Sequence, residues 1–146
     1  MKLHQLSVFL ENKPGQMAEP CRVLACAGIN IRTLTLADTQ QFGILRMIVS
    51  DWQKGADLLK DAGYVVNVAE VVAVEVPDRP GGLAEVVKTF ERTEININYM
   101  YAFPFGRGED RAVLIFRFDK PDAAIERLQE AGINVVGSVE VYNRID

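Results

Sequence analysis

A segment that occurs twice constrains the fold of this chain more than any other feature of its sequence. Residues 12–19 and 78–85 each contain a polar side chain, a Pro-Gly pair and the beginning of an apolar pattern, and they lie 66 residues apart. The tripeptide Ile-Asn-Ile follows at residues 29–31 and again at 95–97, with the same offset. Because two landmarks share one register, the chain is expected to contain two copies of a single supersecondary unit.

A third landmark indicates an insertion in the second copy. The Ala-Gly pairs at residues 62–63 and 131–132 are 69 residues apart, so three residues have been added between the landmarks. The glycine-containing segment 105–110 is the expected place for them, in a hairpin. A chain of 146 residues is long enough for two small modules. We expect the repeats to span residues 1–71 and 72–146.

Both copies read as strand, helix, strand, strand, helix, strand when apolar period and chain breakers are combined. In the second copy, four apolar residues are spaced for a helix with one buried stripe: Leu83, Val86, Val87 and Phe90. The elements expected in the first copy are a strand over residues 6–10, a helix over 17–27, strands over 29–36 and 43–49, a helix over 52–62 and a strand over 64–71. Those expected in the second are a strand over 72–76, a helix after Pro80 and Gly81, strands over 95–103 and 111–118, a helix from Pro121 to Ala131 and a strand over 135–141. This order predicts an α+β protein of two ferredoxin-like βαββαβ repeats, each an antiparallel sheet with its helices on one face.

The apolar pattern also bears on the ends and faces of these elements. Proline is accommodated in a helix only in the opening turn, so Pro20 requires the first helix to begin near Met17. Residues 113–116, and Ile44 with Leu45, are apolar at neighbouring positions, whereas a sheet with one wet face alternates. The second sheet face should therefore be covered, either by the other repeat or by another chain, and a homodimer is expected.

Composition excludes several classes of function. The formal net charge of -4 and the lack of a basic run argue against a nucleic-acid surface. No apolar run approaches the ~20 residues that span a bilayer, and the first residues do not resemble a signal peptide, so we expect no membrane segment and a cytoplasmic location.

The residues that usually carry catalysis or bind metals are sparse. His4 is the single histidine, and Cys21 and Cys26 are spaced neither for a CxxC motif nor for a disulfide framework, so reduced, packed thiols and no metal site are expected. There is no nucleophile elbow and no phosphate-binding loop. We therefore predict no catalytic residues and no cofactor. An enzyme that uses carboxylates alone is the remaining catalytic alternative.

The repeated segments resemble a known family. Residues 10–17 followed by 27–31 resemble the start of an ACT domain, and so do residues 76–82 followed by 94–97. ACT domains are small ligand-binding modules of regulated amino-acid biosynthetic enzymes. The first repeat is also similar to the regulatory subunit of acetolactate synthase, whereas the second departs from that subunit by carrying its own complete Asp-x-Pro-Gly motif. The resemblance implies a pair of ACT domains that binds amino acids.

The Pro-Gly turns are the candidate ligand sites. Proline followed by glycine suits a type II turn, and a turn from strand to helix leaves the first helical amides free to bind a carboxylate. A side-chain oxygen of Asn12 or Asp78 can accept bonds from an α-ammonium group, and Asn30 and Asn96 are candidates for a second polar contact. The candidate residues are Asn12, Pro14, Gly15, Gln16, Met17 and Asn30 in the first repeat, and Asp78, Pro80, Gly81, Gly82, Leu83 and Asn96 in the second. The alternative is that the polar residues only cap their helices and the turns only connect. Because Asp replaces Asn in the second repeat, the two sites can differ in affinity, or one alone can bind.

These features predict a regulatory protein that senses a free amino acid at an ACT-ACT interface and has no catalytic activity. The alternative is a regulatory subunit whose main role is to dock on a catalytic chain of amino-acid metabolism, such as acetolactate synthase.

An aromatic row on one strand either packs across the sheet or lines an apolar pocket: Tyr99, Tyr101, Phe103 and Phe105.

Overall fold

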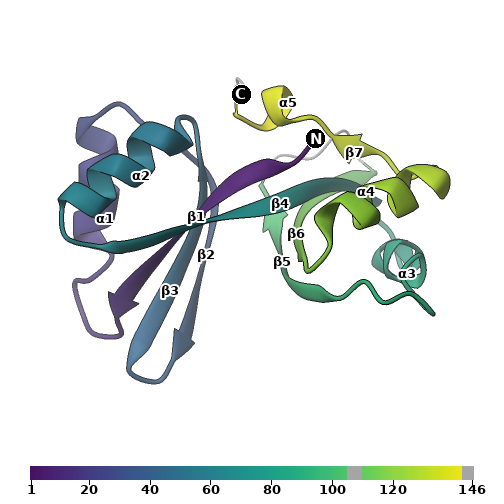
Figure 1. Cartoon of the computed structure of the whole chain (residues 1–146), viewed down its shortest axis with the longest axis horizontal. Helices are drawn as coiled ribbons and strands as arrows, with labels where there is room; N and C mark the ends of the chain where they lie inside the picture. The colour runs from purple at the N-terminus through teal and green to yellow at the C-terminus, as the bar shows by residue number, and fades with distance from the viewer. Residues whose placement is uncertain (105–109, 143–146) are drawn as a thin grey trace. The chain divides into compact units, whose positions relative to one another are not determined.

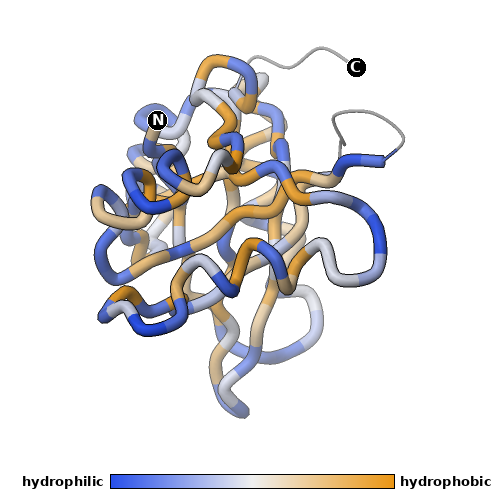
Figure 2. Tube along the Cα trace, turned by 90° about the vertical axis from the view of Figure 1, so that its right-hand side faces the viewer, coloured by the Kyte–Doolittle hydropathy of each residue, from blue (hydrophilic) through white to orange (hydrophobic). Residues whose placement is uncertain are grey.

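The computed structural model describes residues 1–104 and 110–142, and the chain divides into two compact units. The first unit consists of residues 4–69, and the second of residues 1–3 together with 70–146. Each unit combines a sheet with helices (Figure 1). Apolar residues follow the strands, and most connecting turns are hydrophilic (Figure 2).

The first unit is a four-stranded sheet with two helices. Its elements are β1 (Leu3–Glu11), α1 (Ala18–Cys26), β2 (Ile31–Thr39), β3 (Phe42–Val49), α2 (Trp52–Asp61) and the beginning of β4 (Val65–Pro77). The strand order is β2-β3-β1-β4, so β2 lies at an edge, and β3 is antiparallel to both of its neighbours. Leu24 of α1 and Leu59 of α2 pack against Leu6 and Met47 in one buried cluster, so both helices cover the same face.

The second unit has the same order of elements. It contains the remainder of β4, then α3 (Gly82–Lys88), β5 (Ile97–Phe103), β6 (Arg111–Phe118), α4 (Pro121–Glu130), β7 (Val135–Val136) and α5 (Ser138–Tyr142). β4 pairs with β6 and β7, and β6 pairs with β5. The ring of Phe118 lies 4.9 Å from that of Phe90 and 5.5 Å from that of Phe116 in its core. The predicted α+β architecture of two βαββαβ repeats is confirmed.

Matching irregularities show how closely the units correspond. The pairing register shifts after Ile31 in the first unit and after Ile97 in the second, which is the offset of 66 residues. Further along, Ala37 pairs with Ile44, and Phe103 pairs with Val113, so the offset rises from 66 (103 minus 37) to 69 (113 minus 44). The three additional residues therefore lie between Phe103 and Val113, and residues 105–109 of the segment expected to contain them lie outside the described residues.

The end of the second repeat differs from the prediction of a strand over residues 135–141. β7 ends at Val136, and the chain then forms the short helix α5. The amide of Val141 donates to the carbonyl of Gly137, one helical turn earlier. In a strand Val139 and Val141 would share a face, but here Val141 is buried and Val139 is 70% exposed. Glycine at residue 137 ends the strand because it contributes no side chain to the sheet.

The expected apolar stripe of the second repeat's first helix is also partly wrong. Val86 and Phe90 are buried, but Leu83 and Val87 are 41% and 39% exposed. α3 ends at Lys88, so Phe90 reaches the core from a turn rather than from the helix. A helix this short presents a narrower buried face, and Leu83 and Val87 lie one turn apart on its outer flank.

Several local predictions hold. α1 begins at Ala18, which keeps Pro20 in its first turn. Val113 and Ile115 point away from the helices of the second unit and are nevertheless buried, as predicted for a covered second face. Both cysteines are free thiols, although Cys26 is exposed rather than packed.

The first residues of the chain belong to the second unit. The Lys2 Nζ lies 3.1 Å from Glu70 Oε2 and 3.0 Å from Asp122 Oδ1. The hydrogen bond to Asp122 and then that to Glu70 raise the pKa of Lys2 above its usual value. Leu3 is fully buried. The chain therefore enters the first unit after residue 3 and returns to the second unit after residue 69.

Candidate functional site

The first Pro-Gly turn connects β1 to α1 through a backbone that only glycine adopts easily. Gly15 has a φ of +85°, and the equivalent Gly81 has a φ of +84°, as the predicted turns require. The amide of Asn12 continues the ladder beyond β1, since it donates to the carbonyl of Gln41 at 2.9 Å. The chain then turns at Pro14 and Gly15 and enters α1 with Met17 as the N-cap.

The turn leaves backbone donors free at the beginning of α1. Among the described residues, the amides of Gly15, Gln16 and Met17 have no hydrogen-bond acceptor, whereas the amide of Ala18 donates to Gly15. Unpaired amides at a helix N-terminus, together with the helix dipole, attract anions. The turn can therefore bind a carboxylate.

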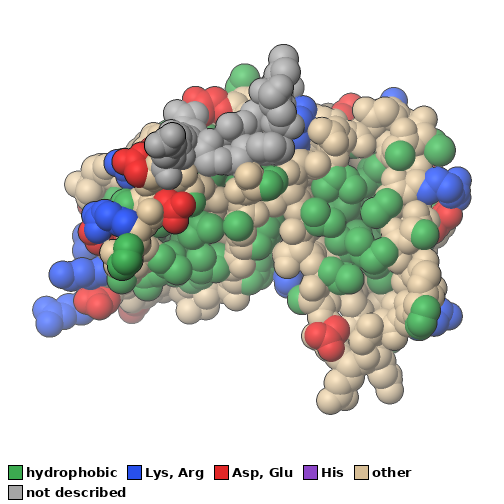
Figure 3. Space-filling view, turned by 180° about the vertical axis from the view of Figure 1, so that it is seen from behind, with side chains coloured by type: hydrophobic (Ala, Val, Ile, Leu, Met, Phe, Trp, Pro, Cys, Tyr) green, Lys and Arg blue, Asp and Glu red, His purple; other side chains and the backbone are tan. Residues whose placement is uncertain are grey.

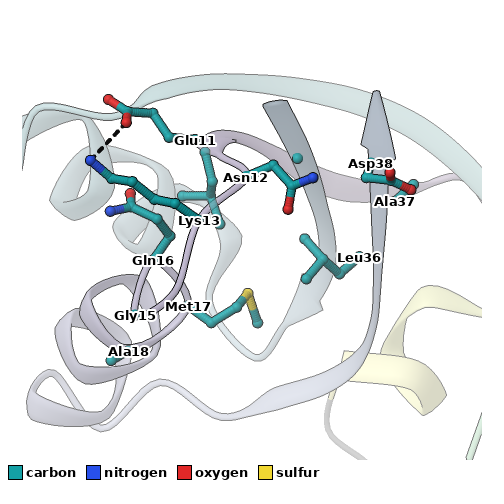
Figure 4. Close-up of a pocket in the computed structure, with 12 residues that line it drawn as sticks. Glu11, Asn12, Lys13, Gly15, Gln16, Met17, Ala18, Leu36, Ala37 and Asp38 are labelled. Carbon is teal, nitrogen blue, oxygen red and sulfur yellow. Dashed lines mark ion pairs between the residues drawn. The ribbon is translucent and has the colours of Figure 1, made fainter. Parts of the chain in front are cut away.

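A cavity of about 380 Å³ lies beside these amides. Its lining comes from β1, the turn, α1, β2 and β3, all within the first unit. The lining residues are Leu10, Glu11, Asn12, Lys13, Gly15, Gln16, Met17, Ala18, Leu36, Ala37, Asp38 and Gly43. Met17 and Leu36 point toward each other across the cavity (Figure 4).

The register of the sheet explains the hollow. Gly43 of β3 pairs with Leu10 of β1 on one side and with Asp38 of β2 on the other, so these three residues form one row across the sheet. The middle member has no side chain. A Cβ built on Gly43 would lie 3.4 Å from a methyl group of Leu36, an ordinary van der Waals contact.

Polar groups are arranged asymmetrically around the cavity. The Lys13 Nζ is paired with Glu11 Oε2 at 2.8 Å, on the side away from Leu36 (Figure 4). The Nδ2 of Asn12 donates to the carbonyl of Gln40 at 2.8 Å, which holds the amide group in place. Its oxygen therefore stays available and is directed to the space between Met17 and Leu36 (Figure 4).

The sequence profile of the ACT domain pair family matches residues 1–144. The chain belongs to this family. As an ACT domain pair, it is similar to protein BT0572 from Bacteroides thetaiotaomicron, a crystal structure with 38% identity and a TM-score of 0.89, over 97% of this chain and 96% of that one. The resemblance to ACT domains is thereby confirmed. A search of curated proteins finds no match.

More distant structures share the fold of the ACT domain pair. The regulatory subunit of aspartate kinase from Thermus thermophilus, in a ligand-free form, has 18% identity and a TM-score of 0.63, over 88% of this chain and 91% of that one. The regulatory subunit of aspartate kinase from Thermus flavus has 17% identity and a TM-score of 0.60, over 90% and 94% of the two chains. At such low identity these matches support the fold alone.

The ACT domain pair brings four of the predicted residues of the first repeat to the cavity: Asn12, Gly15, Gln16 and Met17. Pro14 belongs to the turn but not to the lining. Asn30 lies at the other end of β2, about 23 Å from Ala37 at roughly 3.3 Å per residue. Its amide donates to Ser50 Oγ at 3.0 Å, and its carbonyl accepts from the amide of Ser50 at 2.9 Å. The structure thus separates Asn30 from the turn.

Asn96 occupies the same position in the second unit. Its amide donates to Asp119 Oδ1 at 2.8 Å, and its carbonyl accepts from the amide of Asp119 at 3.1 Å. Its side chain donates to the Oδ1 of Asn98. The Ile-Asn-Ile motif therefore joins the beginning of one strand to the end of the next in both units.

The second turn contains the remaining predicted residues: Asp78, Pro80 and Gly81 lie between β4 and α3, and Gly82 and Leu83 begin α3. The amide of Asp78 donates to the carbonyl of Asp110 at 2.8 Å, which repeats the bond made by Asn12. Here, however, the amide of Gly82 donates to the carbonyl of Arg79 at 2.9 Å. One of the donors that the first turn leaves free is therefore used in the second.

Sequence reasoning missed the part of the cavity that the sheet supplies: Leu10, Glu11, Leu36, Ala37, Asp38 and Gly43. Two signals were present in the sequence. Glycine within an expected strand often marks a close backbone approach. In addition, Leu34, Leu36 and Asp38 alternate on one strand, so a carboxylate shares a face with apolar residues.

Other kinds of site are not indicated. Within residues 1–104 and 110–142, no group of three or more His, Cys, Asp or Glu side chains is placed to hold a metal ion. None of the helices in this part of the chain combines the length and apolar character needed to cross a bilayer. Tyr101 and Phe103 pair across strands with Ile115 and Val113, and Phe105 lies outside the described residues.

Proposed function

We propose that this ACT domain pair is a non-catalytic regulatory protein that binds a free amino acid at its first Pro-Gly turn. One observation carries the proposal: the free amides of Gly15, Gln16 and Met17 border a cavity of about 380 Å³. That volume lies within the range of roughly 300 to 1,000 Å³ typical of small-molecule pockets.

The polarity of the cavity supports a zwitterionic ligand. The carboxylate would accept hydrogen bonds from the turn amides at the positive end of the α1 dipole. The oxygen of Asn12 faces the cavity and would accept a bond from the ammonium group (Figure 4). The ligand's side chain would then lie against Leu10, Met17 and Leu36. Bound in this way, an amino acid satisfies donors that the protein leaves unpaired.

A second copy of the chain is the proposed cover of the cavity, which would place the ligand at an ACT-ACT interface. Leu34 and Leu36 of the edge strand β2 are 45% and 53% exposed, although both alternate on the face that holds the core. Hydrophobic side chains are gathered at the surface of the first unit (Figure 3). An open edge with exposed apolar residues favours association. Light scattering of the purified protein would then give the mass of a dimer. The mass of a monomer for Leu34→Lys would identify this edge as the contact.

The alternative is a regulatory subunit that acts by docking on a catalytic chain of amino-acid metabolism, such as acetolactate synthase. The exposed pair Leu83 and Val87 on α3 supports a protein contact in the second unit. The two proposals differ in a simple observable. A docking subunit would co-purify with a large catalytic chain and would show no change of stability with free amino acids.

The test is a thermal-shift screen of the twenty L-amino acids. A ligand that binds only the folded state adds about 2.7 kcal/mol at one hundred times its dissociation constant, and this raises the Tm by several degrees for a chain of this size. Gly15→Val should abolish the shift, because a β-branched residue at positive φ distorts the amides. Gly28→Val is the matched control, since Gly28 also has positive φ and open space around it but lies outside the cavity. If no amino acid raises the Tm of the wild type, the proposed function is wrong.

A further inference from the structure

Resting on that proposed function, we propose that each chain holds one amino-acid site, in the first unit only, and that Asp38 is its specificity-determining residue. The Asp38 carboxylate receives the ammonium group of the ligand. The site therefore distinguishes an α-amino acid from the 2-oxo acid with the same side chain.

The charges of the cavity single out Asp38. Glu11 and Lys13 neutralise each other at 2.8 Å. Among the residues that the structure describes, the Asp38 carboxylate has neither an ion pair nor a hydrogen bond, and it is exposed. Its row neighbour Gly43 has no side chain to separate it from Leu10. The cavity thus has a net negative charge with no partner in the protein, and a cationic group fits that charge.

The second unit lacks this arrangement. With the offsets established by the strand registers, the row of Leu10, Gly43 and Asp38 corresponds to Val76, Ala112 and Pro104. Val76 does pair with Ala112 in the structure. Ala112 has a methyl side chain where Gly43 has none. Pro104 has no carboxylate, so nothing at that position can receive an ammonium group.

The second turn also lies closer to its own strand. A Cβ built on Gly82 would lie 1.9 Å from the carbonyl oxygen of Pro77, so the backbone there has no room for any side chain. The equivalent residue of the first turn is Gln16, whose side chain is accommodated beside the cavity. The first turn therefore stands away from β1, whereas the second is pressed against β4.

One amide and two charged side chains of the second turn are used within the protein. The amide of Gly82 is occupied by the carbonyl of Arg79. The guanidinium of Arg79 pairs with Glu85 of α3 at 2.7 Å and so bridges the turn. In the first unit Lys13 pairs backward to Glu11, and Glu19 pairs with Arg22, so no ion pair bridges the first turn among the described residues. The second turn serves as a connection, and the first as a site.

Isothermal titration calorimetry tests the proposal. The probes are the L-amino acid that binds the wild type most tightly of the twenty, and the 2-oxo acid of the same side chain. We expect a stoichiometry near one per chain and no heat from the 2-oxo acid. Asp38→Asn should weaken binding by about 10- to 100-fold, because a charge-assisted bond becomes a neutral one. Gly81→Val should leave the stoichiometry unchanged.

The control for Asp38→Asn is Asp57→Asn, which removes the same charge from an exposed position on α2 of the same unit. Equal affinities of these two variants, two ligands per chain, or equal binding of the 2-oxo acid would overturn the inference while leaving an amino-acid-binding protein. A wild type that binds none of the twenty would overturn the proposed function and this inference together.

Discussion

Gly82→Ala is the substitution for which the structure makes the sharpest stability prediction. By helix propensity alone the change should be favourable, since alanine is better than glycine in a helix by up to about 1 kcal/mol. Gly82 is the first residue of α3. The structure predicts the opposite sign, because the new Cβ would lie 1.9 Å from the carbonyl oxygen of Pro77 and 2.9 Å from its carbonyl carbon.

The magnitude follows from what must move. Real Cβ contacts essentially never fall below 3.0 Å, so the turn and the end of β4 must separate by at least 1.1 Å (3.0 minus 1.9). Pro77 pairs with Arg111, and the amide of Asp78 donates to Asp110, so the end of this ladder would be lost. Overpacking costs about 1 to 3 kcal/mol and a lost hydrogen bond about 1 kcal/mol, which gives about 3 kcal/mol in total. At roughly 2 to 4 °C per kcal/mol, the Tm should fall by about 6 to 12 °C.

Gly81→Ala is the matched control in the same turn. Its Cβ would meet nothing within 4 Å, so the cost is only that of a positive φ, about 1 to 2 kcal/mol. Calorimetry or circular dichroism melting of both variants gives the comparison. If Gly82→Ala melts at or above the temperature of Gly81→Ala, the turn is not pressed against β4, and the explanation of the closed second turn is wrong.

Two further predictions concern the cores and the chain's beginning. Leu59→Ala, at a fully buried position of the first core, should lower the free energy of unfolding by about 3 kcal/mol in urea titration; a loss below about 1 kcal/mol would show that the site is loosely packed. Lys2→Met should make the protein less stable than the wild type at neutral pH. Because the folded-state pKa of Lys2 is raised, this difference in stability should be complete at pH values below the unfolded-state pKa of 10.5 and should disappear as the pH rises through the folded-state pKa. A difference in stability that is independent of pH would contradict the ion pairs to Glu70 and Asp122.

How much could be predicted from the sequence depended on whether the signal was local. The repeat and the Pro-Gly pairs indicated the order of elements and the positive φ of Gly15 and Gly81, because each rests on a few adjacent residues. The strand predicted after Val136 was wrong. Val139 and Val141 alternate as in a strand, and this pattern does not reveal that the strand ends before glycine at residue 137. The floor of the cavity was missed because Leu10, Asp38 and Gly43 meet only through the register of three strands.

The three residues that precede the first unit make the second unit discontinuous in the chain. Leu3 is synthesised before the first unit, whereas residues 70–146 of its own unit are synthesised after it. A fragment that starts at residue 70 would lack the Lys2 ion pairs and the buried Leu3. A fragment that joins residues 1–3 directly to residue 70 would contain all residues of the second unit, but without the first unit between them. No single cut in the chain can therefore separate the two units with all of their residues.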